Sequence, residues 1–278
     1  MTGTAWEPLG GVSADALSDA RLQLHHAAQI VSSVGITYLP HAADDSHTNM
    51  EWTRGALSGH PVPGPRPFRA AIFPASLTLA LLDESGNAAE ELSLFGQTLD
   101  SGYRWMGEAI ARWTTAPLRP LRRPDYMLPE HSTLRGEPFR AESAEGLREL
   151  GRWYGNAGRL LATMMPSFSG SSPVRCWPHH FDIAMLLPEG EGKSVGVGLS
   201  PGDETYPQPY WYVSPYPYPK HPELAALPSR GRWHQGSFFA AVLTGCDLVG
   251  GGPAGEQEAR SRAFLQAAVS ECMTMLRV

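Results

Sequence analysis

The order of helical and strand-like segments is the feature that most constrains the fold of this chain. Apolar residues recur at helical spacing in four segments, 14–34, 98–113, 143–165 and 256–276. Strand-like runs fall between the first two helices, at 48–57, 68–73, 77–82 and 91–95, and between the last two, at 174–187, 194–199, 209–213 and 233–243. Because helices flank groups of strands instead of alternating with single strands, the sequence predicts an α+β fold with a mainly antiparallel sheet and covering helices.

The same order suggests two similar α-β-β-β-α halves, 14–115 and 139–278, within a single compact unit over 1–278. The proline-rich segment 116–138 joins these halves. It is long for an internal loop, so it is either an ordered wrap or a semi-rigid linker.

Charge and composition limit the partners that the chain can have. The formal net charge is -6 and the sequence pI is about 5.9, which argues against binding to nucleic acid or to an anionic membrane. Residues 1–11 show no signal-peptide pattern, and no window approaches the roughly 18 apolar residues of a membrane span. Three widely spaced cysteines suit a reducing compartment. We expect a soluble, cytoplasmic protein, with the Ala, Gly, Pro and Arg richness that is typical of a GC-rich bacterial genome.

His180 and Asp182 are the first candidate site. If 174–187 is one continuous strand, the two side chains share a face, about 7 Å apart at their Cα atoms. They could then bind one metal ion or form a carboxylate–imidazole pair with catalytic use. Trp177 and His179 would lie on the other face as ligand-binding candidates. The alternative is a satisfied polar pair on the sheet without catalytic use.

Asp203 and Glu204 follow a Ser-Pro-Gly turn, where they could complete a His/Asp/Glu metal site or cap the turn. The aromatic-proline run that comes next contains Tyr210, Tyr212 and Tyr216. Rigid aromatic side chains with polar tips could wall a ligand pocket or form a dimer interface. The alternative is a strand that packs on its own core.

Three other patterns are weaker evidence for a functional site. Gly198-Leu-Ser-Pro-Gly202 matches a nucleophile elbow in letters only, because Pro201 has no N–H for an oxyanion hole. The glycine-rich stretch 250–255 lacks the second strand of a dinucleotide fold, so no nucleotide cofactor is expected. The loop after the first helix holds His41, Asp44, Asp45 and His47, enough ligands for a metal ion, although loop polarity explains them equally well.

Two motifs carry a resemblance to a known family. They are Trp-x-x-x-Phe-Asp at 177–182 and Tyr-x-Tyr-x-x-Pro-Tyr-Pro at 210–217, and they follow a Leu-His-His-Ala-Ala-Gln-Ile-Val stretch at 24–31. In this order they look like an uncharacterised bacterial family, a domain of unknown function of about this length. That family has no established activity, so the resemblance implies an architecture and no reaction.

Two function hypotheses follow from these patterns. The first is a small-molecule-binding protein or enzyme, whose cleft is lined by His180, Asp182, Asp203 and the aromatic residues of 210–216, with a divalent metal as the candidate cofactor. In a catalytic version His180 carries the proton or binds the metal and Asp182 selects its tautomer. The second is a non-enzymatic homo-oligomeric assembly or interaction protein, whose aromatic-proline segment forms the interface with a second copy or with another partner.

Overall fold

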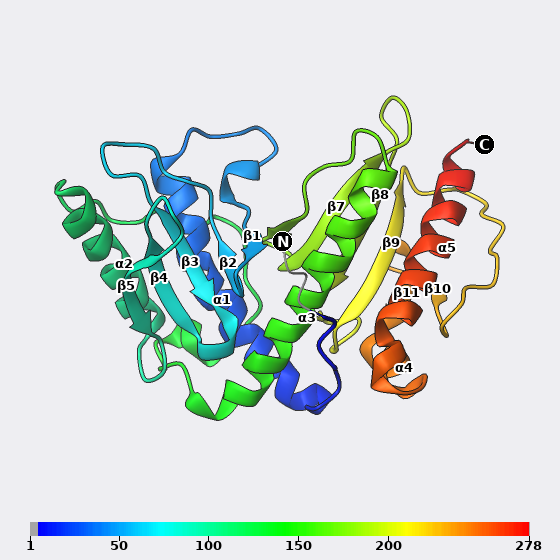
Figure 1. Ribbon diagram of the computed structural model, residues 1–278, viewed down its shortest axis with the longest axis horizontal. Helices are drawn as coiled ribbons and strands as arrows, with labels where there is room; N and C mark the ends of the chain where they lie inside the picture. The colour runs from blue at the N-terminus through cyan, green and yellow to red at the C-terminus, as the bar shows by residue number, and fades with distance from the viewer. Residues whose placement is uncertain (1–4, 278) are drawn as a thin grey trace. The chain divides into compact units, whose positions relative to one another are not determined.

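Two antiparallel sheets, one of five strands and one of six, organise the chain (Figure 1). The computed structural model describes residues 5–277, so residues 1–4 and 278 of the expected 1–278 unit lie outside the description. Contacts divide the chain into two compact units. Unit 1 comprises the described residues up to Ala14, Arg152–Val174 and the chain from Asp182 onward, and unit 2 comprises Asp15–Gly151 and Arg175–Phe181. The predicted α+β class is confirmed.

The four predicted helices are present, as α1 (Ala14–Tyr38), α2 (Leu99–Thr114), α3 (Ala144–Met164) and α5 (Gln257–Arg277). Thr98 caps α2, because its hydroxyl accepts a hydrogen bond from the backbone N–H of Ser101 at 3.2 Å. A short helix that the periodicity did not predict, α4 (Gly245–Gly250), is capped in the same way by Thr244. No helix among the described residues is long and apolar enough to span a membrane.

The sheet of unit 2 is a meander in the order β1-β2-β3-β4-β5. Its strands are β1 (Glu51–Thr53), β2 (Ala56–Ser58), β3 (Arg69–Phe73), β4 (Thr78–Leu82) and β5 (Ala88–Ser93). The prediction of one strand over 48–57 is wrong. Arg54 and Gly55 have φ values of 50° and 80°, which reverse the chain into a two-residue hairpin between β1 and β2.

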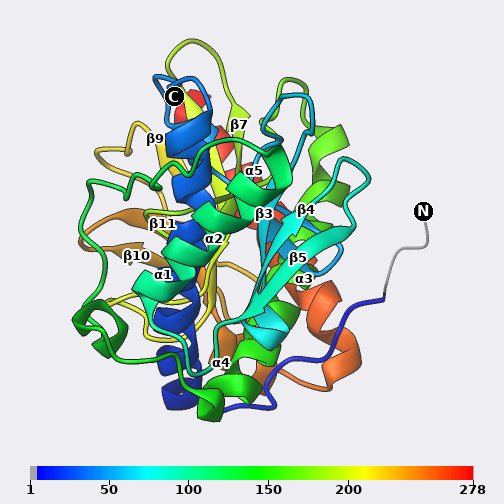
Figure 2. The ribbon, with the colours of Figure 1, turned by 90° about the vertical axis from the view of Figure 1, so that its left-hand side faces the viewer.

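Helices α1 and α2 lie on one face of this sheet (Figure 2). They approach closely at Gly102, where an added Cβ would lie 2.7 Å from Ile30 Cδ1 and 3.5 Å from Leu79 of β4. The predicted apolar face of α1 is buried, with Leu24, Val31 and Val34 at most 2% exposed. Burial of this apolar face is what holds the helix pair on the sheet.

The opposite face of α1 is polar and also buried, and the segment 116–138 lies against it. Thr37 Oγ1 accepts from the Arg122 backbone N–H at 2.9 Å, and Gln29 Oε1 accepts from the Tyr126 hydroxyl at 2.6 Å. Nearer the start of the helix, His26 Nε2 lies 2.9 Å from the carbonyl oxygen of Pro129. Of the two alternatives for this segment, the ordered wrap is the one that the structure has.

Five strands of the second sheet lie in unit 1, in the order β10-β11-β9-β8-β7. They are β7 (Asp182–Pro188), β8 (Ser194–Ser200), β9 (Tyr210–Tyr216), β10 (Arg232–Gln235) and β11 (Phe239–Thr244). Helix α5 packs across β8, β9 and β11 (Figure 1). One register row, consisting of Ile183, Leu199, Trp211 and Leu243, is at most 1% exposed and belongs to the core of this unit.

Two further strand predictions are wrong. The run 233–243 is a hairpin of β10 and β11, because residues 236–238 turn the chain. The run 174–187 is interrupted after β6 (Arg175–Trp177), which pairs through Cys176 with the backbone of Met50. The interruption is a turn over 178–181, in which Phe181 has a φ of 60° and donates its N–H to the carbonyl of Trp177 at 2.7 Å.

Candidate functional site

His180 and Asp182 do not share a strand face, because the turn over 178–181 separates them. His180 is exposed at this turn and belongs to unit 2, whereas Asp182 begins β7 in unit 1. The prediction of one continuous strand that brings these two side chains to the same face is therefore wrong. Side chains do not alternate strictly between the two faces of a strand here, because the positive φ at Phe181 changes the direction of the chain.

Asp182 instead accepts a hydrogen bond from the hydroxyl of Tyr212, which crosses from β9. The glycine at 198, on the intervening strand β8, makes this possible. A Cβ there would lie 2.7 Å from both Tyr212 Oη and Ala184 Cβ. Burial, and then the charge of Asp182, raise the pKa of Tyr212, so the phenol stays protonated as the donor.

Asp203 closes the turn before β9. Its Oδ1 accepts from the backbone N–H groups of Thr205 and Tyr206, both at 2.8 Å, and its Oδ2 accepts from the Tyr210 hydroxyl at 2.5 Å. The structure therefore favours the turn interpretation of Asp203. Glu204 next to it is exposed, and Tyr216 is 65% exposed at the far end of β9. Within unit 1, the candidate residues thus form two tyrosine–carboxylate pairs, with the rings of Tyr210 and Tyr212 6.3 Å apart.

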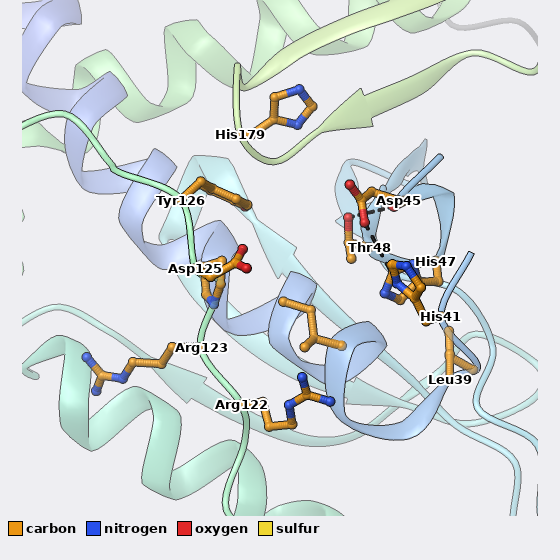
Figure 3. A pocket seen from close by; sticks show the side chains of 12 residues that line it. Leu39, His41, Asp45, His47, Thr48, Arg122, Arg123, Asp125, Tyr126 and His179 are labelled. Atoms are coloured by element: carbon orange, nitrogen blue, oxygen red, sulfur yellow. Dashed lines mark hydrogen bonds and ion pairs between the residues drawn. The ribbon is translucent and has the colours of Figure 1, made fainter. Parts of the chain in front are cut away.

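Unit 2 contains a cavity of about 560 Å³ (Figure 3). It is lined by the end of α1, the loop that follows, the segment 122–126 of the wrap and the turn after β6. The lining residues are Ile36, Leu39, His41, Asp45, His47, Thr48, Arg122, Arg123, Pro124, Asp125, Tyr126 and His179. Such a volume suits a small molecule.

Three potential metal ligands meet on one wall of this cavity. His41, Asp45 and His47 each offer one ligand atom, and these atoms lie within 4.8 Å of one another. Nδ1 of His41 is 3.9 Å from Oδ1 of Asp45, and the two imidazole rings are 5.1 Å apart, edge to face. Ligand atoms held at about 2.0–2.2 Å from one ion require a somewhat tighter cluster. The His41 and Asp45 side chains, 76% and 68% exposed, have the freedom to close this difference.

The backbone of this loop is held closely against α1. A Cβ at Gly35 would lie 2.2 Å from the carbonyl oxygen of His47, so only glycine permits the contact. Asp45 adopts a φ of 57°, and its carbonyl accepts from the backbone N–H of Thr48 at 3.0 Å and from its hydroxyl at 2.8 Å. Helix packing and a tight turn thus place the three ligand side chains together.

The wrap forms another wall, and the two of its arginines that line the cavity, Arg122 and Arg123, point in different directions (Figure 3). Arg123 points away from the histidines, donates to Asp100 Oδ1 at 2.5 Å and lies 4.4 Å above the ring of Tyr103. Arg122 extends toward the side of the cavity where His41 and His47 lie. Its guanidinium makes no hydrogen bond or ion pair with the residues that the structure describes.

His179 reaches this cavity from the turn after β6, with its ring 6.0 Å from that of Tyr126. Partial burial, and then the neighbouring His180, lower the pKa of His179, which favours its neutral form. Burial raises the pKa of Tyr126, whose hydroxyl is held by Gln29 of α1. The wall opposite the metal ligands therefore offers a neutral imidazole and a phenol.

The sequence predicts His179 as a ligand-binding residue and shows the loop histidines, but it does not indicate Arg122, Arg123, Asp125 and Tyr126. No local pattern identifies them, because they lie in a proline-rich segment without regular structure. In the structure, Gln29 and Thr37 are buried on the polar face of α1, and this segment supplies their hydrogen-bond partners. Trp177 contributes a ring 6.2 Å from His179 without lining the cavity.

Comparison of the chain with protein-family models, with curated proteins and with solved structures finds no match. The function must therefore be argued from the site itself.

Proposed function

We propose that this protein is a metal-dependent small-molecule enzyme whose site is the cavity of unit 2. One observation carries the proposal, which is that the ligand atoms of His41, Asp45 and His47 cluster on the wall of a cavity large enough for a substrate. Two imidazoles and a carboxylate suit a divalent transition-metal ion such as Zn²⁺ or Fe²⁺.

Three protein ligands leave at least one coordination position for water or substrate. A metal at this position acts as a Lewis acid and lowers the pKa of a bound water, which favours hydrolytic chemistry. His179 lies on another wall of the same cavity and is the candidate proton acceptor. His180, the ligand proposed from the sequence, has no place in this set.

The test is the metal content of the untagged full-length protein after loading with Zn²⁺ and gel filtration. We expect about one zinc per chain in the wild type and a loss of zinc in His47→Ala. Two exposed histidines outside the cluster give matched controls, and His180→Ala and His221→Ala should both keep their zinc. Zinc-free wild type, or equal zinc in His47→Ala, would rule out the metal site.

The proposal includes a cytoplasmic location. Cys176, Cys246 and Cys272 are all free thiols, which supports the reducing compartment expected from the composition.

A second candidate, homo-oligomeric assembly through the aromatic-proline segment, is favoured by the exposure of Tyr216 and Tyr218, at 65% and 53%. Tyr210 and Trp211 are buried within unit 1, so only the end of the segment is available for this role. Measurement of the subunit mass for the wild type and a Tyr216→Ser/Tyr218→Ser variant tests it. A wild type that is already a monomer removes this candidate.

A further inference from the structure

We infer that the cavity of unit 2 selects a small molecule that carries an oxyanion, a carboxylate or a phosphate, and that Arg122 binds this group. The inference rests on the proposed metal site and adds the class of substrate to it. It starts from a charge in the cavity that has no partner among residues 5–277, the guanidinium of Arg122.

The two neighbouring arginines differ in their availability. Arg123 is engaged by Asp100 and stacked on Tyr103, so its role is to fasten the wrap to α2. Arg122 is held only through its backbone, whose N–H donates to Thr37 at 2.9 Å, and its side chain extends into the cavity (Figure 3). This backbone contact fixes the position from which the side chain extends, and the N–H donors of the guanidinium remain available to a ligand.

The charge balance of the lining points to an anionic ligand. The charge of Arg123 is balanced by its ion pair with Asp100. The remaining charged lining residues are one arginine, Arg122, and two aspartates, Asp45 and Asp125. They sum to one negative charge, and a bound divalent cation changes this sum to one positive charge. A carboxylate would neutralise it, whereas a second cation would be repelled.

The chemistry of the two cationic groups fits one ligand. A guanidinium donates two parallel hydrogen bonds to a carboxylate or phosphate, and the metal accepts an oxygen of the same molecule. Arg122 and the histidines extend from different walls toward each other, so the ligand would lie between them. Asp125 and Tyr126 on the same segment could accept hydrogen bonds from its hydroxyl or amino groups.

The experiment measures binding of three probes to the full-length protein by calorimetry, with and without zinc. The probes are malonate, inorganic phosphate and malonamide, the uncharged analogue of malonate. We expect zinc-loaded wild type to bind malonate or phosphate and not malonamide. Whichever of the two anions binds more tightly identifies the carboxylate or the phosphate as the natural group.

Two arginine variants then locate the anion. Arg122→Gln should weaken anion binding roughly tenfold to hundredfold and leave the zinc content unchanged. Arg122→Lys keeps the charge without the paired donors and should restore binding in part. Arg135 is exposed and lies outside the lining, so Arg135→Gln is the matched control and should bind as the wild type does.

The outcomes separate this inference from the metal proposal. Equal anion affinity in Arg122→Gln and wild type overturns the inference even when zinc is bound. If the wild type takes up no zinc, the metal proposal has failed, and the same comparison without zinc decides whether Arg122 binds the anion alone. Binding of malonamide as tight as that of malonate also overturns the inference.

Discussion

At the scale of single residues, the tyrosines of β9 show how burial decides a role that the sequence leaves open. Tyr212 and Tyr216 lie on the same face of one strand, yet Tyr212 donates to Asp182 and Tyr216 extends into solvent. The hydroxyl of Tyr212 stabilises the folded protein, because its removal would take a hydrogen-bond donor away from a partly buried carboxylate.

Tyr212→Phe should therefore destabilise the protein by about 1–3 kcal/mol, since the ring is retained and only the hydroxyl is lost. The matched control is Tyr216→Phe, which removes a hydroxyl from an exposed ring and should leave the stability unchanged. Urea denaturation followed by tryptophan fluorescence measures both. Equal stability of the two variants would show that the Tyr212–Asp182 hydrogen bond has no net effect.

At the scale of elements, β8 is shaped by two glycines on the same strand face. The Tyr212 ring crosses the strand at Gly198, where an added Cβ would be 2.7 Å from its oxygen. At Gly196 the nearest atoms to such a Cβ are 3.8 Å away, an ordinary contact. Both positions are glycines of β8, but position 196 has room for a side chain and position 198 does not.

Gly198→Ala should destabilise the protein by about 1–3 kcal/mol through overpacking, because the new methyl group displaces the ring and with it the bond to Asp182. Gly196→Ala should be neutral or slightly stabilising, since alanine restricts the unfolded chain more than glycine does. The measurement is the midpoint of urea denaturation of each variant. A destabilisation of Gly196→Ala as large as that of Gly198→Ala would contradict the packing argument.

At the scale of the whole molecule, the short segment 175–181, which belongs to unit 2, packs against α1 and also supplies one wall of the cavity. The carbonyl of Pro178 lies 2.8 Å from Nε2 of buried His25 and accepts from Gln29 at 2.9 Å, and His25 stacks on Phe181 at 4.6 Å. These contacts hold the turn that presents His179. Burial lowers the pKa of His25 to about 3, so the imidazole is neutral in the folded protein.

This burial predicts acid sensitivity. An unfolded histidine binds its proton near pH 6.5, whereas folded His25 does so only near pH 3, so the unfolded chain takes up the proton first. The contribution of His25 to the free energy of unfolding is then complete above about pH 6.5. It falls by about 1.4 kcal/mol per pH unit as the pH drops toward 3.

The variant His25→Gln keeps a donor for Pro178 and cannot titrate, so its loss of stability between pH 7 and pH 4.5 should be smaller than that of the wild type by about 2–3 kcal/mol. His221→Gln, at an exposed position, should show the wild-type loss. Urea denaturation at the two pH values gives the comparison, and an unchanged loss in His25→Gln would mean that His25 is not the sensitive group.

The sequence by itself determined the α+β class and the four long helices, because helical periodicity acts over a few residues. It could not place the turn over 178–181, since the positive φ at Phe181 follows no local pattern. Only the tertiary structure decided the site. The Arg122–Thr37 bond spans 85 residues and the Tyr126–Gln29 bond spans 97, and contacts at such separations depend on the whole fold.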